Sequence, residues 1–131
     1  MRLGVIGGLG PAATAHFMEL IVGMTKAERD QDHLEMIIYS YPNIPDRTKY
    51  ILGSSRDNPL VPMIDIGHKL KEQGVDCIAI PCVTAHSFYD GLRSSIGLPI
   101  INAVKETART LKKEGITKVG IMATDGTMAT G

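Results

Sequence analysis

The sequence LGVIGGLGPAATAHFMELIVGMTKA, residues 3–27, contains an apolar run, a glycine-rich turn and an amphipathic stretch in that order. The run Leu3–Ile6 is typical of a buried strand, and the glycines after it suit a tight turn. Pro11 suits the first position of a helix. We expect this helix to reach about Ala27 and to place four apolar residues on one face: Ala13, Phe17, Leu20 and Met24.

The same order of apolar run and amphipathic stretch recurs along the rest of the chain. Further strands are predicted at Met36–Tyr39, Cys77–Ile80, Ile100–Ile101 and Val119–Met122, and further helices at about 60–70, 85–96 and 104–111. These helices are followed by glycines that suit a left-handed C-terminal residue: Gly74, Gly97 and Gly115. Continuous apolar strands alternating with helices predict an α/β fold, with a parallel sheet of about four strands and helices on both faces.

The pattern also predicts a domain boundary near the end of the chain. We expect residues 1–115 to form a first α/β lobe, and residues 116–131 to begin a second lobe with the strand Val119–Met122. A strand and loop without a covering helix leave an apolar face unprotected, so we expect a truncated chain. The first lobe contains Cys82, the residue that we expect to be catalytic.

The composition gives no indication of a nucleic-acid or membrane partner. Lys and Arg number 14, as do Asp and Glu, so the balanced charge gives no reason to expect nucleic acid or an anionic membrane. No apolar run approaches the ~20 residues of a membrane span, and no signal-peptide core follows Met1. Cys77 and Cys82 lie too close along one extended segment to pair, so the expected compartment is the cytoplasm.

Cys82 is the leading candidate for chemistry. It follows Pro81 at the carboxyl end of the third predicted strand, where ligands bind in open α/β sheets. The helix expected from about Thr84 would favour its thiolate. Cys77, inside the apolar strand, fits the alternative of a small buried cysteine. His86, one helical turn after Cys82, could relay a proton or orient the loop, or it could be a hydrogen-bonded structural residue. Thr84 either caps the helix or donates a hydrogen bond to a substrate carboxylate.

The turn Gly7–Pro11 admits three interpretations. Its amides could hold a substrate carboxylate, with Gly8 and Leu9 in contact, or it could be a plain tight turn. The segment also fits the dinucleotide pattern G-x-G-x-x-A. That pattern requires an acidic residue after the second strand, where Tyr39, Ser40 and Tyr41 stand instead.

The polar connection 41–58 is long enough to suggest function. Arg47 within it could grip a carboxylate with two hydrogen bonds, or simply pair with Asp46 at the surface. Three potential metal ligands precede the second strand: Asp30, Asp32 and His33. On one polar turn they are better explained as a solvated loop, so no metal is predicted.

Together these stretches resemble the aspartate/glutamate racemase family. The matching segments, in the family's order, are Gly7–Pro11 with Ala13–Thr14, then Asp30–His33, Pro42–Thr48, Pro81–His86 and Ala123–Thr127. The resemblance implies two similar lobes with the substrate between them, a homodimer, and two cysteines on opposite sides of the substrate Cα. It implies proton transfer by these thiols without pyridoxal phosphate or metal, so no cofactor is expected.

Carried onto this sequence, the resemblance makes Cys82 the first-lobe thiol and Arg47 the residue that grips the side-chain carboxylate. Thr84 and Thr124 fall around the substrate carboxylate, and His86 and Thr127 support the site. The other expected substrate contacts are Gly8, Leu9, Asn43 and Val83. The expected substrate is a small acidic amino acid, aspartate or glutamate.

Two departures keep other functions open. Val83 stands where most members have an asparagine, and valine cannot donate a hydrogen bond. The second-lobe cysteine would lie beyond Gly131, so we expect the 131-residue chain alone not to complete a two-thiol racemisation. The alternatives are a protein that binds a small carboxylate or amino acid without turning it over, and a nucleotide-binding domain.

Overall fold

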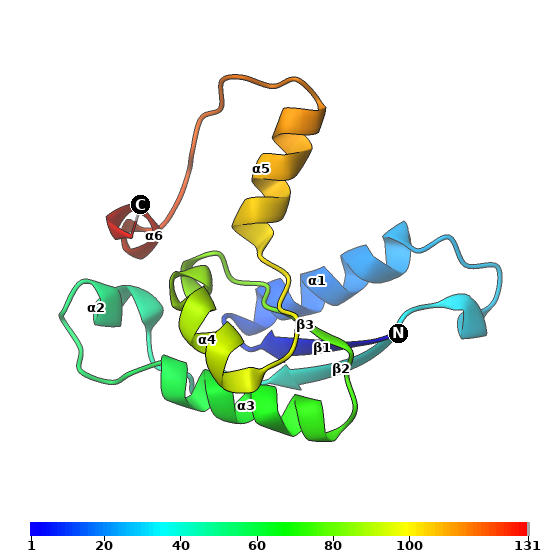
Figure 1. The fold of residues 1–131 in the computed structure, drawn as a ribbon, viewed down its shortest axis with the longest axis horizontal. Helices are drawn as coiled ribbons and strands as arrows, with labels where there is room; N and C mark the ends of the chain where they lie inside the picture. The colour runs from blue at the N-terminus through cyan, green and yellow to red at the C-terminus, as the bar shows by residue number, and fades with distance from the viewer. Residues whose placement is uncertain (131) are drawn as a thin grey trace.

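The computed structural model of the chain describes residues 1–130. Its elements, in chain order, are β1 Arg2–Gly7, α1 Pro11–Met24, η1 Asp30–Asp32, β2 Glu35–Ser40, α2 Arg47–Ile51, α3 Leu60–Glu72, β3 Cys77–Ala79, η2 Thr84–Phe88, α4 Tyr89–Ile96, α5 Ala103–Lys113 and α6 Asp125–Ala129. The chain is therefore an α/β protein, as predicted, with helices and strands in alternation (Figure 1).

The sheet is parallel and has three strands in the order β2-β1-β3. The predicted fourth strand is reduced to one bridge between Ile78 and Ile100. Two hydrogen bonds hold this bridge, from Ile78 N to Pro99 O at 2.9 Å and from Ile101 N to Ile78 O at 2.8 Å. The strands of the sheet are therefore parallel, as predicted, but a single bridge between Ile78 and Ile100 replaces the fourth strand.

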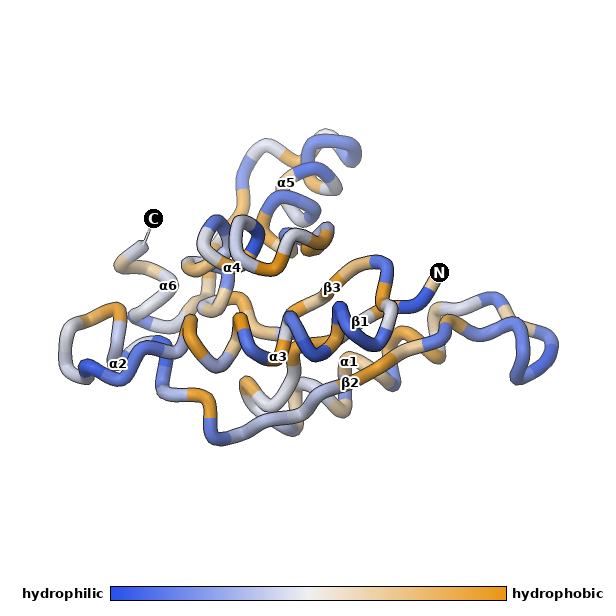
Figure 2. The backbone as a smooth tube through the Cα atoms, turned by 60° about the horizontal axis from the view of Figure 1, so that its bottom comes forward, coloured by the Kyte–Doolittle hydropathy of each residue, from blue (hydrophilic) through white to orange (hydrophobic). Residues whose placement is uncertain are grey.

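Two apolar clusters cover the two faces of the sheet. On one face, α1 packs Phe17 and Ile21 against Leu3, Val5 and Ala79. On the other face, α3 and α4 enclose the larger cluster, which includes Met63, Ile66, Leu70, Leu92 and Ile96. Figure 1 shows α1 and α3 on opposite sides of the sheet, and the turn between α1 and β2 is strongly hydrophilic (Figure 2). Helices thus lie on both faces, as predicted.

The face that α1 turns to the sheet differs from the predicted one. Thr14 is buried, and Phe17 and Ile21 pack on the sheet, whereas Leu20 is exposed and Met24 is 80% exposed. Apolar residues occur almost all round this helix, so their spacing does not select one face. The helix also ends at Met24, where the Thr25 hydroxyl donates to Ile21 O at 2.6 Å.

Residues 119–122 do not form the predicted strand. They lie in an irregular segment that runs from α5 to α6, and Ile121 is 73% exposed (Figure 1). Strand preference is weak without neighbours, and no strand within residues 1–130 pairs with this segment. The segment instead leads to α6, which lies beside α2.

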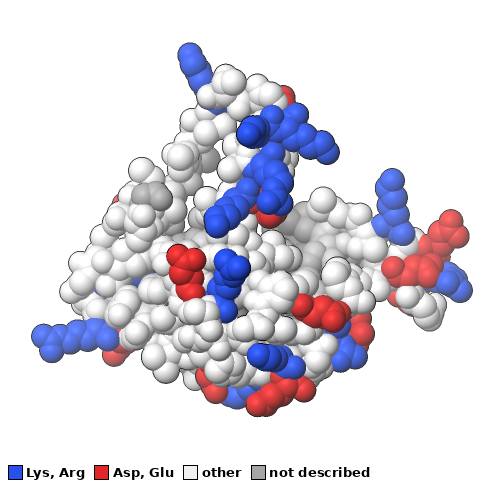
Figure 3. All heavy atoms as spheres, viewed as in Figure 1, with Lys and Arg blue, Asp and Glu red and all other residues white. Residues whose placement is uncertain are grey.

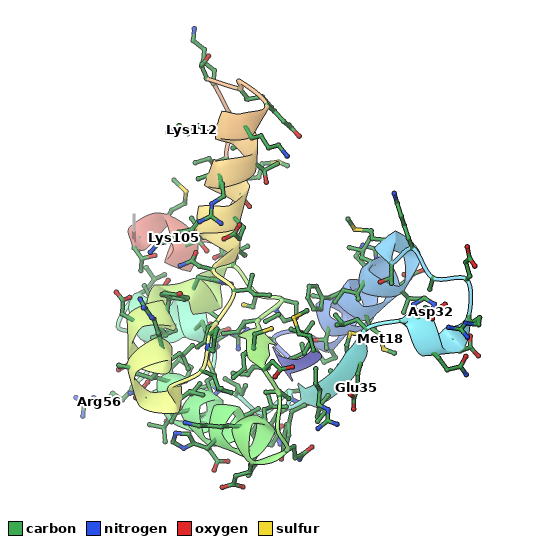
Figure 4. All side chains as sticks on the ribbon, turned by 45° about the vertical axis from the view of Figure 1, so that its right-hand side comes forward. Met18, Asp32, Glu35, Arg56, Lys105 and Lys112 are labelled. Atoms are coloured by element: carbon green, nitrogen blue, oxygen red, sulfur yellow. The ribbon has the colours of Figure 1, made fainter. Side chains whose placement is uncertain are left out.

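Helix α5 stands clear of the sheet and is largely exposed. None of its residues is buried, although the sequence places Val104, Ala108 and Leu111 on one face. Lys and Arg side chains gather over it in Figure 3, and Lys105 and Lys112 lie along it in Figure 4. In the described part of the chain, no helix is both long and apolar enough to cross a bilayer.

Candidate active site

The carboxyl ends of the three strands bring together the loops that the sequence singles out. Gly7, Ser40 and Ala79 end β1, β2 and β3, and the parallel direction places all three ends at one edge of the sheet. A pocket of about 490 Å³ lies there. Its walls are Leu9, Asp46, Arg47, Thr48, Cys82, Val83, Thr84, Met122, Ala123, Thr124 and Thr127.

Seven of the predicted site residues therefore line one pocket, although they come from four distant segments. Gly8, Asn43 and His86 are not in its walls, and Asn43 is exposed to solvent. Four further residues line the pocket and are absent from the predicted site: Asp46, Thr48, Met122 and Ala123. The position of Thr48 beside Arg47 is a signal that points to it, whereas Met122 carries no chemical signal and falls in the predicted strand Val119–Met122.

The glycine turn positions its neighbours through Gly8. This residue has φ +86°, and a Cβ atom on it would lie 2.5 Å from the backbone of Tyr41. The Gly8 N–H donates to Thr14 Oγ1 at 2.9 Å, and that hydroxyl donates to Gly10 O at 3.0 Å. The Gly8 amide is thus occupied within the turn, which favours the tight-turn interpretation for this residue.

Arg47 is fixed by backbone carbonyl groups from two loops. Its Nη1 donates to Pro45 O at 3.1 Å and to Ile44 O at 3.3 Å, and its Nη2 donates to Leu9 O at 3.5 Å. Its Nε is buried and has no hydrogen-bond partner in the described chain. Asp46 does not pair with Arg47, because its carboxylate caps α2 by accepting from Lys49 N at 2.9 Å. The guanidinium is held against the pocket wall and keeps unused donors.

Three threonine hydroxyls form a cluster in the pocket. Thr84 Oγ1 lies 2.8 Å from Thr124 Oγ1 and 2.9 Å from Thr127 Oγ1, which lie 3.1 Å from each other. Thr84 is buried and comes from η2, whereas the other two belong to the start of α6. The cluster ties the end of the chain to the Cys82 loop. Spacing alone cannot pair residues that lie 40 apart in sequence; the family resemblance is what places Thr84 and Thr124 around one carboxylate, with Thr127 in support.

Close packing holds α6 at the same place. Gly126 is buried, and a Cβ atom on it would lie 2.9 Å from the Thr48 Cα. Ser87 Oγ and Thr130 Oγ1, 3.1 Å apart, make a further contact between η2 and the end of α6. The described end of the chain therefore forms one wall of the pocket.

Cys82 lies in the pocket wall, at the loop between β3 and η2. Its N–H donates to Ile80 O at 2.8 Å, and its carbonyl accepts from His86 Nδ1 at 2.8 Å. The other ring nitrogen, Nε2, accepts from Ala103 N at 3.1 Å. Both nitrogens of His86 are thus engaged with the backbone, which supports the structural interpretation of this residue over the proton relay.

Cys77 occupies a different environment. It lies within β3 and packs against the smaller apolar cluster. Burial raises the pKa of the Cys77 thiol, and the neighbouring Asp76 carboxylate raises it further. A raised pKa lowers the thiolate fraction at neutral pH.

We therefore expect iodoacetamide to modify Cys82 before Cys77. At pH 7 the rate should differ by about tenfold or more, because only the thiolate reacts and the raised pKa of Cys77 lowers its thiolate fraction. Peptide mass spectrometry over time measures both rates in one sample. Faster modification of Cys77 would contradict the assignment of the two thiols.

The turn before β2 has a separate structure. Arg29 pairs with Asp32 at 2.7 Å, and this side-chain hydrogen bond lowers the pKa of the Asp32 carboxyl. Within residues 1–130, no three or more His, Cys, Asp or Glu side chains gather in a way that could hold a metal ion. The turn lies outside the pocket walls.

Comparisons with known proteins identify the family of the chain. The family described as Asp/Glu/Hydantoin racemase matches residues 6–131. The broad specificity amino-acid racemase RacX of Bacillus subtilis (strain 168) is 31% identical over 113 residues, which are 83% of this chain and 48% of that protein. The chain thus spans about half the length of this relative.

Solved structures show the same fold. Picrophilus torridus aspartate racemase superposes with a TM-score of 0.92 and 34% identity, over 99% of this chain and 55% of that one. An aspartate racemase homologue from Pyrococcus horikoshii OT3 matches in fold, with a TM-score of 0.73 and 21% identity over 87% of this chain and 50% of its own. The match of the family to nearly all of the sequence is decisive: the chain belongs to the Asp/Glu/Hydantoin racemase family.

Proposed function

We propose that the pocket binds an acidic amino acid, aspartate or glutamate, and that the Cys82 thiolate exchanges the proton on its Cα. The observation that carries the proposal is the composition of the pocket, where one thiol lies in the same walls as a guanidinium and three threonine hydroxyls. A dicarboxylate needs donors at both ends, and a weakly acidic Cα proton needs a positioned base.

The donors divide into two groups that suit the two carboxylates. Arg47 would take the side-chain carboxylate with the Nη hydrogens that the backbone leaves free, because its Nε is buried. The cluster of Thr84, Thr124 and Thr127 would turn its hydroxyls toward the α-carboxylate, where negative charge develops when the Cα proton leaves. Both groups act through residues already fixed by other contacts.

The proposed chemistry is a balanced proton transfer. The Cys82 thiolate forms an S–H bond as the Cα–H bond breaks, and the electron pair passes into the α-carboxyl group. Return of the proton to the same face restores the substrate, whereas delivery of a proton to the opposite face inverts it. Inversion therefore needs a second acid across the substrate, and Cys82 is the one thiol in the walls of the described pocket.

Val83 supports a second candidate, a carboxylate binder without turnover. Its side chain is 55% exposed and lines the pocket beside Cys82, where it offers no hydrogen bond to a substrate. This candidate predicts calorimetric binding of aspartate or glutamate, no exchange of the Cα proton, and no effect of thiol alkylation on binding.

Chiral chromatography of a panel of L-amino acids tests the proposed substrate class. A protein that supplies this pocket together with a second acid should convert aspartate or glutamate to the D-enantiomer faster than lysine or methionine, because Arg47 would pair with a side-chain carboxylate. Equal rates for all four amino acids would remove the argument from Arg47, and conversion of none would favour the binder.

Replacing Arg47 with lysine should weaken binding of aspartate by about 10- to 100-fold, because lysine cannot form the two parallel hydrogen bonds of a guanidinium. Arg56→Lys is the matched control, since Arg56 is exposed and lies outside the pocket walls (Figure 4). Titration calorimetry measures both affinities. Equal affinities in the two variants would show that Arg47 does not hold the substrate.

A further inference from the structure

His86 has a single tautomer that its two contacts determine. Its Nδ1 lies 2.8 Å from the Cys82 carbonyl oxygen, which can only accept a hydrogen bond. Its Nε2 lies 3.1 Å from Ala103 N, which can only donate. The ring therefore carries its proton on Nδ1 and is neutral.

The Nδ1 hydrogen bond completes the fixing of the Cys82 backbone. The Cys82 N–H already donates to Ile80 O at 2.8 Å, so both polar groups of this residue have a partner. The direction of the Cα–Cβ bond follows from the backbone, and the sulfur then occupies one of the staggered positions about that bond. His86 thus contributes to the position of the thiol without lining the pocket.

The Nε2 contact connects this loop to α5. Ala103 is the first residue of α5, and its N–H has no partner within the helix, so His86 satisfies it. The chain then runs through α5 and the irregular segment to Thr124, which returns to Thr84. Residues of η2 therefore hold both ends of the stretch that supplies the second part of the pocket wall.

We propose that His86 is a positioning residue for Cys82, acting through the hydrogen bond from Nδ1 to the Cys82 carbonyl. The proposal rests on the proposed function insofar as it concerns turnover. Its structural part concerns only where the thiol lies, and can be measured without a substrate.

Two variants separate the two ring contacts. In His86→Asn the amide nitrogen is attached to Cγ, as Nδ1 is, so the donor to Cys82 remains and the acceptor for Ala103 is lost. In His86→Gln the amide lies one bond further out, so the acceptor for Ala103 remains and the donor to Cys82 is lost. Each variant is thus the control for the other.

The primary measurement is the 13Cβ resonance of labelled Cys82 and its pH titration. We expect His86→Asn to keep the wild-type resonance and titration curve, and His86→Gln to shift both. The amide resonance of Ala103 should behave in the opposite way. If Cys82 responds equally in both variants, or more strongly in His86→Asn, the proposal is overturned; should His86→Gln fail to fold, a displaced Cys82 resonance in His86→Asn alone would overturn it.

Turnover gives the second readout. The rate constant for Cα exchange should fall on the order of 10- to 100-fold in His86→Gln, with little change in KM, because a displaced thiol lies outside reacting distance of Cα. His86→Asn should retain the wild-type rate constant within about threefold, because the thiol keeps its position in this variant. An absence of exchange in the wild type would count against the proposed function alone, whereas the Cys82 resonance would still decide the role of His86.

Discussion

Replacing Cys82 with serine should lower the rate of Cα proton exchange on aspartate by about 10³-fold or more. A serine hydroxyl is a far weaker acid than a thiol, so almost none of it is ionised at neutral pH, and a positioned base contributes about 10²- to 10⁴-fold. Aspartate affinity should change little, because Arg47 and the threonine cluster remain. Proton NMR of aspartate in D2O measures the exchange.

Cys77→Ser is the matched control for this prediction. Cys77 lies in β3 and not in the pocket walls, so the rate of exchange should stay near that of the wild type. If the two serine variants lose the same fraction of the rate, the loss reflects a disturbed sheet rather than a missing base, and Cys82 loses its assigned role.

Replacing Gly8 with alanine should lower the free energy of unfolding by about 2–5 kcal/mol. Two effects combine: a residue with a side chain is strained at φ +86°, and the new Cβ would lie 2.5 Å from the Tyr41 backbone. The Tyr41 backbone cannot move freely, because its N–H donates to Gly7 O at 3.1 Å. Urea denaturation measures the change.

Gly23→Ala is the control, and it should have the opposite sign. Gly23 lies in α1, and an added Cβ there meets no atom within 4 Å. Alanine is the better helix former, so this variant should gain about 0.5–1 kcal/mol. Equal destabilisation by the two alanines would show that the positive φ of Gly8 and its close contact with Tyr41 are not the cause of the lost stability.

The parallel α/β fold could be predicted because each buried strand is a continuous apolar run. Leu3–Ile6 and Cys77–Ile80 are such runs, and burial on both faces of the sheet requires that composition. The face of α1 could not be predicted, because apolar residues nearly surround this helix. The strand at 119–122 was wrong for another reason: a strand depends on its partner, and composition does not supply one.

The site was predictable where residues cluster in sequence, and less so where tertiary contacts assemble it. Cys82, Val83 and Thr84 are consecutive and follow a strand, so their place at the sheet edge follows from the topology. The contact of Thr84 with Thr124 and Thr127 depends on α6 folding back onto α2. The roles of these residues in turnover remain predictions.

The central claim is that an acidic amino acid binds with its Cα beside Cys82. Proton NMR of L-aspartate with the wild-type chain in D2O tests it most directly, because Cys82 alone can exchange the Cα proton even where inversion needs a second acid. We predict loss of the Cα proton signal, with the L-configuration retained if no second acid is present. An intact Cα signal under conditions where calorimetry shows aspartate bound to the chain would contradict the claim.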